Sequence, residues 1–184
     1  MVIIPSDQLT LTEKARKRQE AVTAGIARAV KKLSLTEKEL VYRQAQNIAD
    51  FGTVGREQWL TATLAAINTP YSVWTTLAAP AVGLTPALAN NRVAVFYSVA
   101  VLTVPNPVSL LSFRKGAAAG TTLAVFDLEQ IEAQLITEGY FSLPVEYDPQ
   151  DVLNVIVTSK IATGAQAAVV LGCYIIEPVG TTIS

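Results

Sequence analysis

The chain has 184 residues, of which 51% are hydrophobic and only 16% are charged, and its formal net charge is −1. This length suits one domain, or one domain with an appendage, whose core is large enough to need no disulfide. The near-neutral charge excludes a general electrostatic attraction to nucleic acid or membranes. Charge is unevenly placed, however, because residues 1–50 carry a net of +3 and residues 51–184 a net of −4.

Targeting and membrane signals are missing from the sequence. Its start, MVIIPSDQ, lacks the basic region and long apolar core of a signal peptide. The most apolar block, Val93 to Val104, is shorter than the roughly 20 residues that a membrane helix needs. We therefore expect cytoplasmic synthesis without a membrane span. The single cysteine, Cys173, lies in an apolar run and is expected to be a buried, inert thiol.

The N-terminal part is expected to form an arm and two helices. Residues 1–9 read as a flexible arm whose Ile3 and Ile4 dock on a neighbour. Thr10 and Glu13 have capping-box spacing, which predicts a helix from about residue 11 to residue 33. Its apolar positions form one narrow stripe: Ala15, Val22, Ile26, Ala29, Val30 and Leu33.

A second helix is expected from Leu35 to Phe51. Ser34 and Glu37 repeat the capping-box spacing, and Gly52 would supply the left-handed C-terminal cap. Neither stripe is wide enough for a free-standing domain, so both helices need another surface to pack on. We place the boundary here, with residues 1–52 as an N-terminal anchor and residues 53–184 as a β-sandwich domain.

The second part of the chain predicts a mainly β fold. Short apolar runs alternate with turn residues and there is little helical pattern, which is typical of a sandwich or barrel. Eight runs fit an antiparallel jelly-roll-like β-sandwich. The predicted strands are Trp59 to Ile67, Tyr71 to Ala79, Val93 to Val104, Val108 to Arg114, Thr121 to Asp127, Tyr140 to Glu146, Val152 to Thr158 and Ala168 to Ile176.

The last two runs are expected to be adjacent antiparallel strands joined by a loop. Both faces of the final run are apolar, since Leu171 and Cys173 alternate with Tyr174 and Ile176. A strand that is apolar on both faces is buried on both. Something must therefore cover even the outer side of this sheet. Between the predicted strands, residues 127–139 read as a short crossover helix that Asp127 caps and Gly139 closes.

Catalytic and metal chemistry finds little support. The chain has no histidine, which excludes histidine-dependent nucleophiles, imidazole ligands and the usual general base. Ser112 and Lys115 match S-x-x-K, but the companion motifs are missing. Asp127, Asp148 and Asp151 fit capping and turn roles better than a hard-cation loop. We predict a protein that is not an enzyme, without catalytic, cofactor-binding or metal-binding residues and without a cofactor.

Two residue groups nevertheless invite binding hypotheses. Aromatic residues could stack on sugar rings, although core packing explains them better: Trp59, Tyr71, Trp74, Phe96 and Tyr97. A basic cluster on the first helix invites a nucleic-acid interpretation: Lys14, Arg16, Lys17 and Arg18, with Lys31 and Lys32 later. Interspersed acidic residues and the absence of aromatics favour a solvated face, so we do not expect nucleic acid to bind.

The residues from Tyr140 to Pro178 carry a resemblance to a known family. The stretches LPVEYDP, LNVIVTSKIATG and VVLGCYIIEPVG, with the Thr, Ala and Val richness around them, resemble the jelly-roll domains of tailed-bacteriophage virion proteins. The resemblance is to capsid decoration or cement proteins in particular, and it covers roughly residues 59–184. It implies a structural protein that sits on the capsid as trimers and bridges capsomers.

Resemblance and composition lead to one hypothesis. The chain would be a homotrimeric virion protein, assembled in the host cytoplasm, that binds the major capsid protein or other virion proteins. Partner-binding residues would lie in the N-terminal part: Ile3, Ile4, Lys14, Arg16, Lys17, Arg18, Val22 and Ile26. The alternatives are another phage virion component, from the tail, baseplate or head fibre, a glycan-binding β-sandwich module, and an enzyme of unknown type whose base is not histidine.

Overall fold

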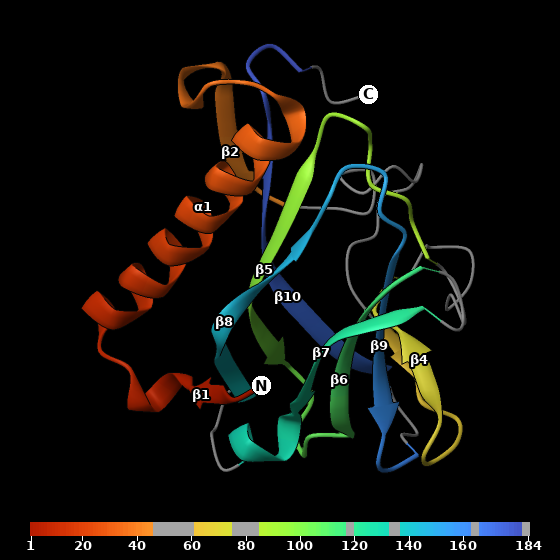
Figure 1. Cartoon of the computed structure of the whole chain (residues 1–184). Helices are drawn as coiled ribbons and strands as arrows, with labels where there is room; N and C mark the ends of the chain where they lie inside the picture. The colour runs from red at the N-terminus through yellow and green to blue at the C-terminus, as the bar shows by residue number, and fades with distance from the viewer. Residues whose placement is uncertain (46–60, 75–84, 117–119, 133–136, 163–165, 182–184) are drawn as a thin grey trace.

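The structure is a computed structural model, and it describes residues 1–45, 61–74, 85–116, 120–132, 137–162 and 166–181 (Figure 1). Its helices are η1 (Ser6–Gln8), α1 (Leu11–Leu33), η2 (Glu37–Glu39) and η4 (Leu128–Ile131), and all but α1 are 3₁₀ turns. Its strands are β1 (Ile3–Pro5), β2 (Leu40–Gln44), β3 (Thr61–Thr63), β4 (Pro70–Ser72), β5 (Val93–Val101), β6 (Val108–Lys115), β7 (Thr121–Asp127), β8 (Thr137–Tyr147), β9 (Leu153–Ser159) and β10 (Gln166–Pro178).

The strands form two antiparallel sheets that face each other. One sheet has six strands in the order β1-β8-β5-β10-β2, with β3 also paired to β10, and the other has four in the order β4-β9-β6-β7. Along the chain from β3 to β10, consecutive strands alternate between the sheets, except for the β6–β7 hairpin. The resulting orders, β3-β10-β5-β8 and β4-β9-β6-β7, are those of an eight-stranded jelly roll. The predicted fold class is confirmed.

The eight predicted strands correspond to β3–β10, with ends that differ by a few residues where they are described. Residues 59–60 and 75–79 of the first two predicted strands lie outside the described residues. One expected pairing is wrong. The runs that form β9 and β10 were expected to lie side by side, but β9 pairs with β4 and β6 whereas β10 pairs with β5, β2 and β3. Their connection crosses the sandwich instead of turning back within one sheet. Sequence proximity favours a hairpin, and only the pairing with distant strands decides against it.

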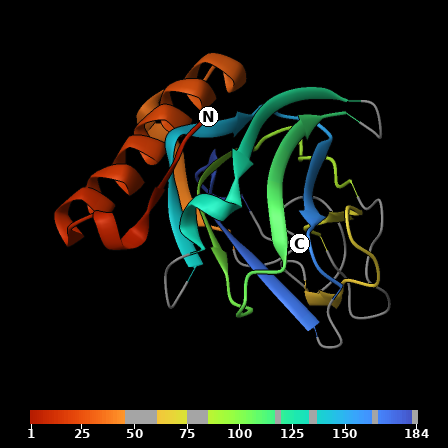
Figure 2. The same cartoon turned by 90° about the horizontal axis from the view of Figure 1, so that it is seen from below.

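Helix α1 covers the outer face of the six-stranded sheet (Figures 1 and 2). It begins as predicted, because the Thr10 hydroxyl accepts from the Glu13 amide while the Glu13 carboxylate accepts from the Thr10 amide. The expected cover over the outer side of the last strand is thus present. A second small core lies beneath the helix: Ala21, Ala29, Val93, Val95, Tyr97, Tyr140 and Ile176.

The apolar stripe of α1 differs partly from the prediction. Val22 and Ala29 are buried as expected, whereas Ala15 is exposed. The closest approach to the sheet occurs at Gly25, where an added Cβ would lie 2.5 Å from Ile176 Cδ1 and 2.7 Å from Val95 Cγ2. Because glycine has no side chain, the backbone of α1 can approach β5 and β10 closely at Gly25.

The second predicted helix is wrong over its described part. Ser34 takes a left-handed conformation that ends α1, and the capping box forms two residues later, between Thr36 and Glu39 of η2. The chain then enters β2, which pairs with β10 from Leu40 to Gln44. Alternating residues in LVYRQ fit a strand as well as a helix, and the open edge of β10 decides between them. The rest of the expected helix, including Phe51 and Gly52, lies outside the described residues.

Two shorter expectations also need correction. The N-terminal arm was expected to dock on a neighbour, but β1 pairs with β8 of its own chain, and Ile3 is only 2% exposed. The crossover helix is limited to the single 3₁₀ turn η4 in the described residues, with Asp127 capping the Glu129 amide. Gly139 does not close that helix, because it lies within β8 opposite Pro5.

The main core fills the space between the two sheets. Aromatic rings from both sheets meet there. The ring centroids of Phe96 on β5 and Phe113 on β6 are 5.2 Å apart, and the stacked rings of Phe126 on β7 and Phe141 on β8 have centroids 4.1 Å apart. Cys173 is buried in the same core, as the sequence predicted. The sandwich is therefore held together by large side chains that were spread over the whole second part of the sequence.

Candidate interaction surfaces

The catalytic candidates are not assembled. On β6, Ser112 and Lys115 are three residues apart, so strand alternation points them to opposite faces. The Lys115 Nζ lies 2.6 Å from the Asp151 Oδ1, and not beside the serine. Within the part of the chain that the structure describes, no group of three or more His, Cys, Asp or Glu residues is arranged to hold a metal ion.

The expected acidic residues have structural roles. Asp127 caps η4, and the Asp151 carboxylate accepts from the Asp148 amide at 2.8 Å, which closes the turn between β8 and β9. Asp148 does more than the sequence predicted. Its two carboxylate oxygens accept from the Arg28 Nε and Nη2 at 2.6 and 2.9 Å, and Lys32 Nζ lies 3.0 Å away. This bidentate pair joins the second half of α1 to the end of the sandwich.

The electrostatics of this junction are balanced. Glu146 adds a third carboxylate, 3.2 Å from Arg28. Lys32, Lys115, Asp148 and Asp151 line an open polar pocket at this junction. Burial disfavours the charged form of Asp148, but the hydrogen bonds from Arg28 and Lys32 outweigh it and hold the pKa of that carboxyl below its usual value. Each acid already has a cation, so the arrangement acts as a clamp and not as a receptor for a charged ligand.

A second ion-pair cluster, also missed from the sequence, ties β2 to the sheet. Glu177 of β10 is 3% exposed, and its two oxygens lie 2.8 Å from Arg43 Nε and 2.7 Å from Arg92 Nε. Removing one partner from this buried cluster would strongly destabilise the fold, because it would leave a buried charge uncompensated. The only sequence signal was the rarity of charge around Arg92.

The aromatic candidates for sugar binding are buried where they are described. Tyr71, Trp74, Phe96 and Tyr97 are between 0 and 8% exposed. Trp59 lies outside the described residues. The rings that could be read from the sequence as a sugar platform therefore pack in the two cores, as the alternative interpretation expected.

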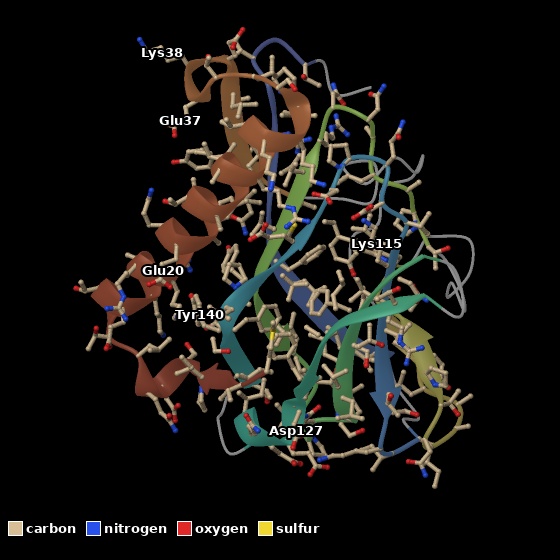
Figure 3. All side chains as sticks on the ribbon, in the orientation of Figure 1. Glu20, Glu37, Lys38, Lys115, Asp127 and Tyr140 are labelled. Carbon is tan, nitrogen blue, oxygen red and sulfur yellow. The ribbon has the colours of Figure 1, made fainter. Side chains whose placement is uncertain are left out.

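A row of tyrosines crosses the outer face of the six-stranded sheet. Tyr140, Tyr97, Tyr174 and Tyr42 come from β8, β5, β10 and β2, and neighbouring ring centroids are 5.0–6.3 Å apart. Burial raises the pKa of Tyr97 well above its ordinary value. The row ends at Tyr42, which is 52% exposed on the edge strand. Arg18 of α1 donates to the Tyr140 hydroxyl at 3.2 Å (Figure 3).

The predicted partner-binding residues divide into two groups. Ile3 and Val22 are buried within their own chain, and Ile26 is half-buried against the core beneath α1. Ile4 is half-buried on β1. The basic residues lie on the first half of α1, where Arg16 is exposed, Lys17 donates to the Ser142 carbonyl at 2.9 Å and Arg18 contacts Tyr140. Lys14, also on this half, is half-buried.

The outer face of the four-stranded sheet carries apolar residues and no described helix (Figure 2). Leu110 of β6 and Val125 of β7 are 39 and 40% exposed, and Ile156 of β9 is half-buried in the same row as Val125. Ser112 lies between Val125 and Ile156, so this row is uncharged. We call this the open face.

Known proteins give no assignment. Among the described helices, none combines the length and the apolar composition required to cross a membrane. Neither a scan against protein-family models nor a search of curated proteins finds a match.

Solved structures of infectious bursal disease virus show a slight likeness. The Gx strain structure is 11% identical with a TM-score of 0.36, and covers 78% of this chain and 34% of that one. The VP2 subviral particle is 10% identical with a TM-score of 0.35, covering 77% and 33%. The chain thus spans about a third of the length of those chains. Scores this low assign neither a family nor a function.

Proposed function

We propose that the chain is a non-enzymatic structural protein of a virus particle, of the type that decorates a capsid and bridges its subunits. The observation that carries the proposal is the jelly-roll topology of β3–β10. Jelly rolls are typical of viral capsid and lectin domains. The step from fold to function is an analogy at the level of the fold. Of the two functions, the surfaces of this chain favour the structural one over the lectin.

The surfaces support a structural role in three ways. The open face presents the uncharged row of Val125, Ser112 and Ile156, beside which Leu110 lies opposite Asp127. The ionic clusters bind parts of the chain to each other, since Asp148 and Glu177 are already paired with arginines. The described rings that the sequence offered for sugar binding, Tyr71, Trp74, Phe96 and Tyr97, are buried. What remains accessible suits contacts with other proteins.

The finer parts of the proposal concern location and partners. The protein would assemble with copies of itself, as a trimer, and with the major capsid protein or another virion protein. Its partner surface would use the basic first half of α1, with Lys14, Arg16, Lys17 and Arg18, together with the open face. The buried Ile3 and Val22 would then act indirectly, by holding β1 and α1 in place.

Quantitative mass spectrometry of purified particles from the source virus tests the proposal. The expected result is tens of copies or more of the chain per particle, released by a dissociating treatment that leaves the capsid closed. Electron microscopy of particles before and after release would locate the density on the head, the tail or the baseplate. Absence of the chain from particles, together with its presence in infected cells, would overturn the proposal.

A further inference from the structure

The first half of α1 projects beyond the sandwich. None of residues 11–20 is buried, whereas the second half buries Ala21, Val22, Gly25 and Ala29. Figures 1 and 2 show the beginning of the helix standing clear of β8. Most helical stability in proteins comes from packing one face on another surface. This half makes few such contacts within its own chain.

The projecting half carries uncompensated positive charge. Lys14, Arg16, Lys17 and Arg18 outnumber Glu13 and Glu20, which leaves a net of +2. The Glu13 carboxylate is already engaged in the helix cap, and Arg18 bonds a neutral hydroxyl. Beside these cations, Leu11 is 86% exposed. The surface therefore combines one apolar side chain with a positive field.

The complementary combination occurs at the η4 end of the sandwich. Asp127, Glu129 and Glu132 are all exposed, Lys160 pairs with Glu132 at 2.6 Å, and the Met1 ammonium donates to the Val125 carbonyl at 3.3 Å, so this end has a net charge of −1. Val125, two residues before Asp127, is 40% exposed. Figure 3 shows Asp127 at the lower end of the molecule, away from Glu20 on α1. Among the described residues, the ion pairs of each group stay within its own side of the molecule.

We propose that the first half of α1 docks on the η4 end of a second copy of this chain, with Lys14 and Arg16 facing Asp127 and Glu129. The inference rests on the proposed structural role and names the partner of the basic surface. Charge complementarity selects that partner, because a net charge of +2 on α1 meets a net charge of −1 at the η4 end. An open row of copies would leave one basic and one acidic end.

Such a contact is heterologous, since the two surfaces that meet are different. Heterologous contacts close into a ring when the rotation between copies allows it, and otherwise extend into a filament. A trimer is one closed form. Because the charges are exposed, salt at a few tenths molar screens them over less than about 10 Å and weakens the contact.

Analytical ultracentrifugation of the full chain over a range of concentrations tests the contact. Lys14→Glu with Arg16→Glu is expected to weaken self-association by about tenfold or more, since each exposed attraction becomes a repulsion. Acidic residues in the first turns favour a helix, so this variant keeps α1 folded. Glu129→Lys with Asp127→Asn should weaken association in the same way. The four changes combined should restore part of it.

Matched controls lie at the other end of α1, where Glu37 and Lys38 are exposed (Figure 3). Glu37→Lys and Lys38→Glu are expected to leave association unchanged. A chain that stays monomeric at every concentration would overturn the head-to-tail contact, as would association that both reversals leave intact or that the combined variant fails to restore. None of these results bears on the presence of the chain in virus particles, so failure here is distinguishable from failure of the proposed function.

Discussion

The two outer faces of the sandwich differ, because α1 covers one of them and no described helix covers the other. The outer face of the six-stranded sheet is sealed by α1, and Ile176 and Val95 beneath it are fully buried. The outer face of the four-stranded sheet keeps Leu110 and Val125 exposed. The covered face is lined by apolar and tyrosine side chains, whereas the open face mixes its apolar residues with Ser112, Asp127 and Thr158. In the described structure, N-terminal residues cover one outer face of the sandwich, and no described helix covers the other.

The largest expected effect separates the two faces directly. Ile176→Ala removes a side chain from beneath α1 and should lower the free energy of unfolding by about 2–5 kcal/mol. Ile156→Ala, on the open face, should cost less than half as much, because that side chain is half-exposed. Urea denaturation of both variants measures the difference. Equal losses would show that the open face is covered within the chain.

The seat of the helix is tested at Gly25. Gly25→Leu forces a side chain into the contact with Ile176 and Val95, and overpacking of this kind costs about 1–3 kcal/mol. Gly25→Ala is a poorer test, because alanine favours a helix by about 1 kcal/mol and offsets part of the clash. Ala27→Leu, on the exposed side of the same turn, should change stability little. Similar losses at residues 25 and 27 would contradict the seating of α1 on this sheet.

The clamp at Asp148 should matter less and should depend on pH. Asp148→Asn is expected to cost about 1 kcal/mol at pH 7, since Arg28 is partly exposed and solvent screens the pair. The pKa of Asp148 is lower in the folded chain, so its contribution is present above its unfolded pKa of about 3.9 and is lost as the pH falls through the lower folded value. Denaturation at several pH values should show the difference between wild type and variant disappearing in acid. A constant difference would exclude this linkage.

The smallest effect is expected on the open face. Leu110→Thr should change the free energy of unfolding by no more than about 0.5 kcal/mol, because the side chain is 39% exposed and lies between the polar residues Asp127 and Thr158 of the neighbouring strands. Thermal unfolding of the dilute protein checks this. A loss of unfolding free energy well above about 1 kcal/mol would mean that Leu110 contributes to the stability of its own chain.

Much of the fold followed from local signals. Strand-length apolar runs bounded by turn residues predicted β5, β6 and β7 closely, and the capping box at Thr10 fixed the start of α1. The apolar outer side of β10 predicted a cover. Each of these signals lies within a single segment, where periodicity and capping chemistry act without reference to the rest of the chain.

What failed depended on distant partners. Leu40–Gln44 forms a strand, and not the predicted helix, because it pairs with the edge of β10. β9 does not pair with β10, because it pairs with β4 and β6 in the other sheet. The clamps of Arg28 with Asp148 and of Arg92 with Glu177 join residues 120 and 85 positions apart, which a single sequence cannot pair. The basic residues of α1 and the acidic residues around η4 can both be found in the sequence, but their placement on separate exposed surfaces is seen only in the structure.

The positions of β1 and β2 have a consequence for the order of folding. Both flank the six-stranded sheet, and their strand partners, β8 and β10, come from the last third of the chain. During synthesis the first 45 residues leave the ribosome long before those strands exist, so only α1, whose backbone hydrogen bonds are local, can begin to form. Contacts this far apart in sequence slow folding. A nascent chain interrupted before β10 would lack the contacts between α1 and β10. It would also leave the edge of β5 open to pairing with other chains.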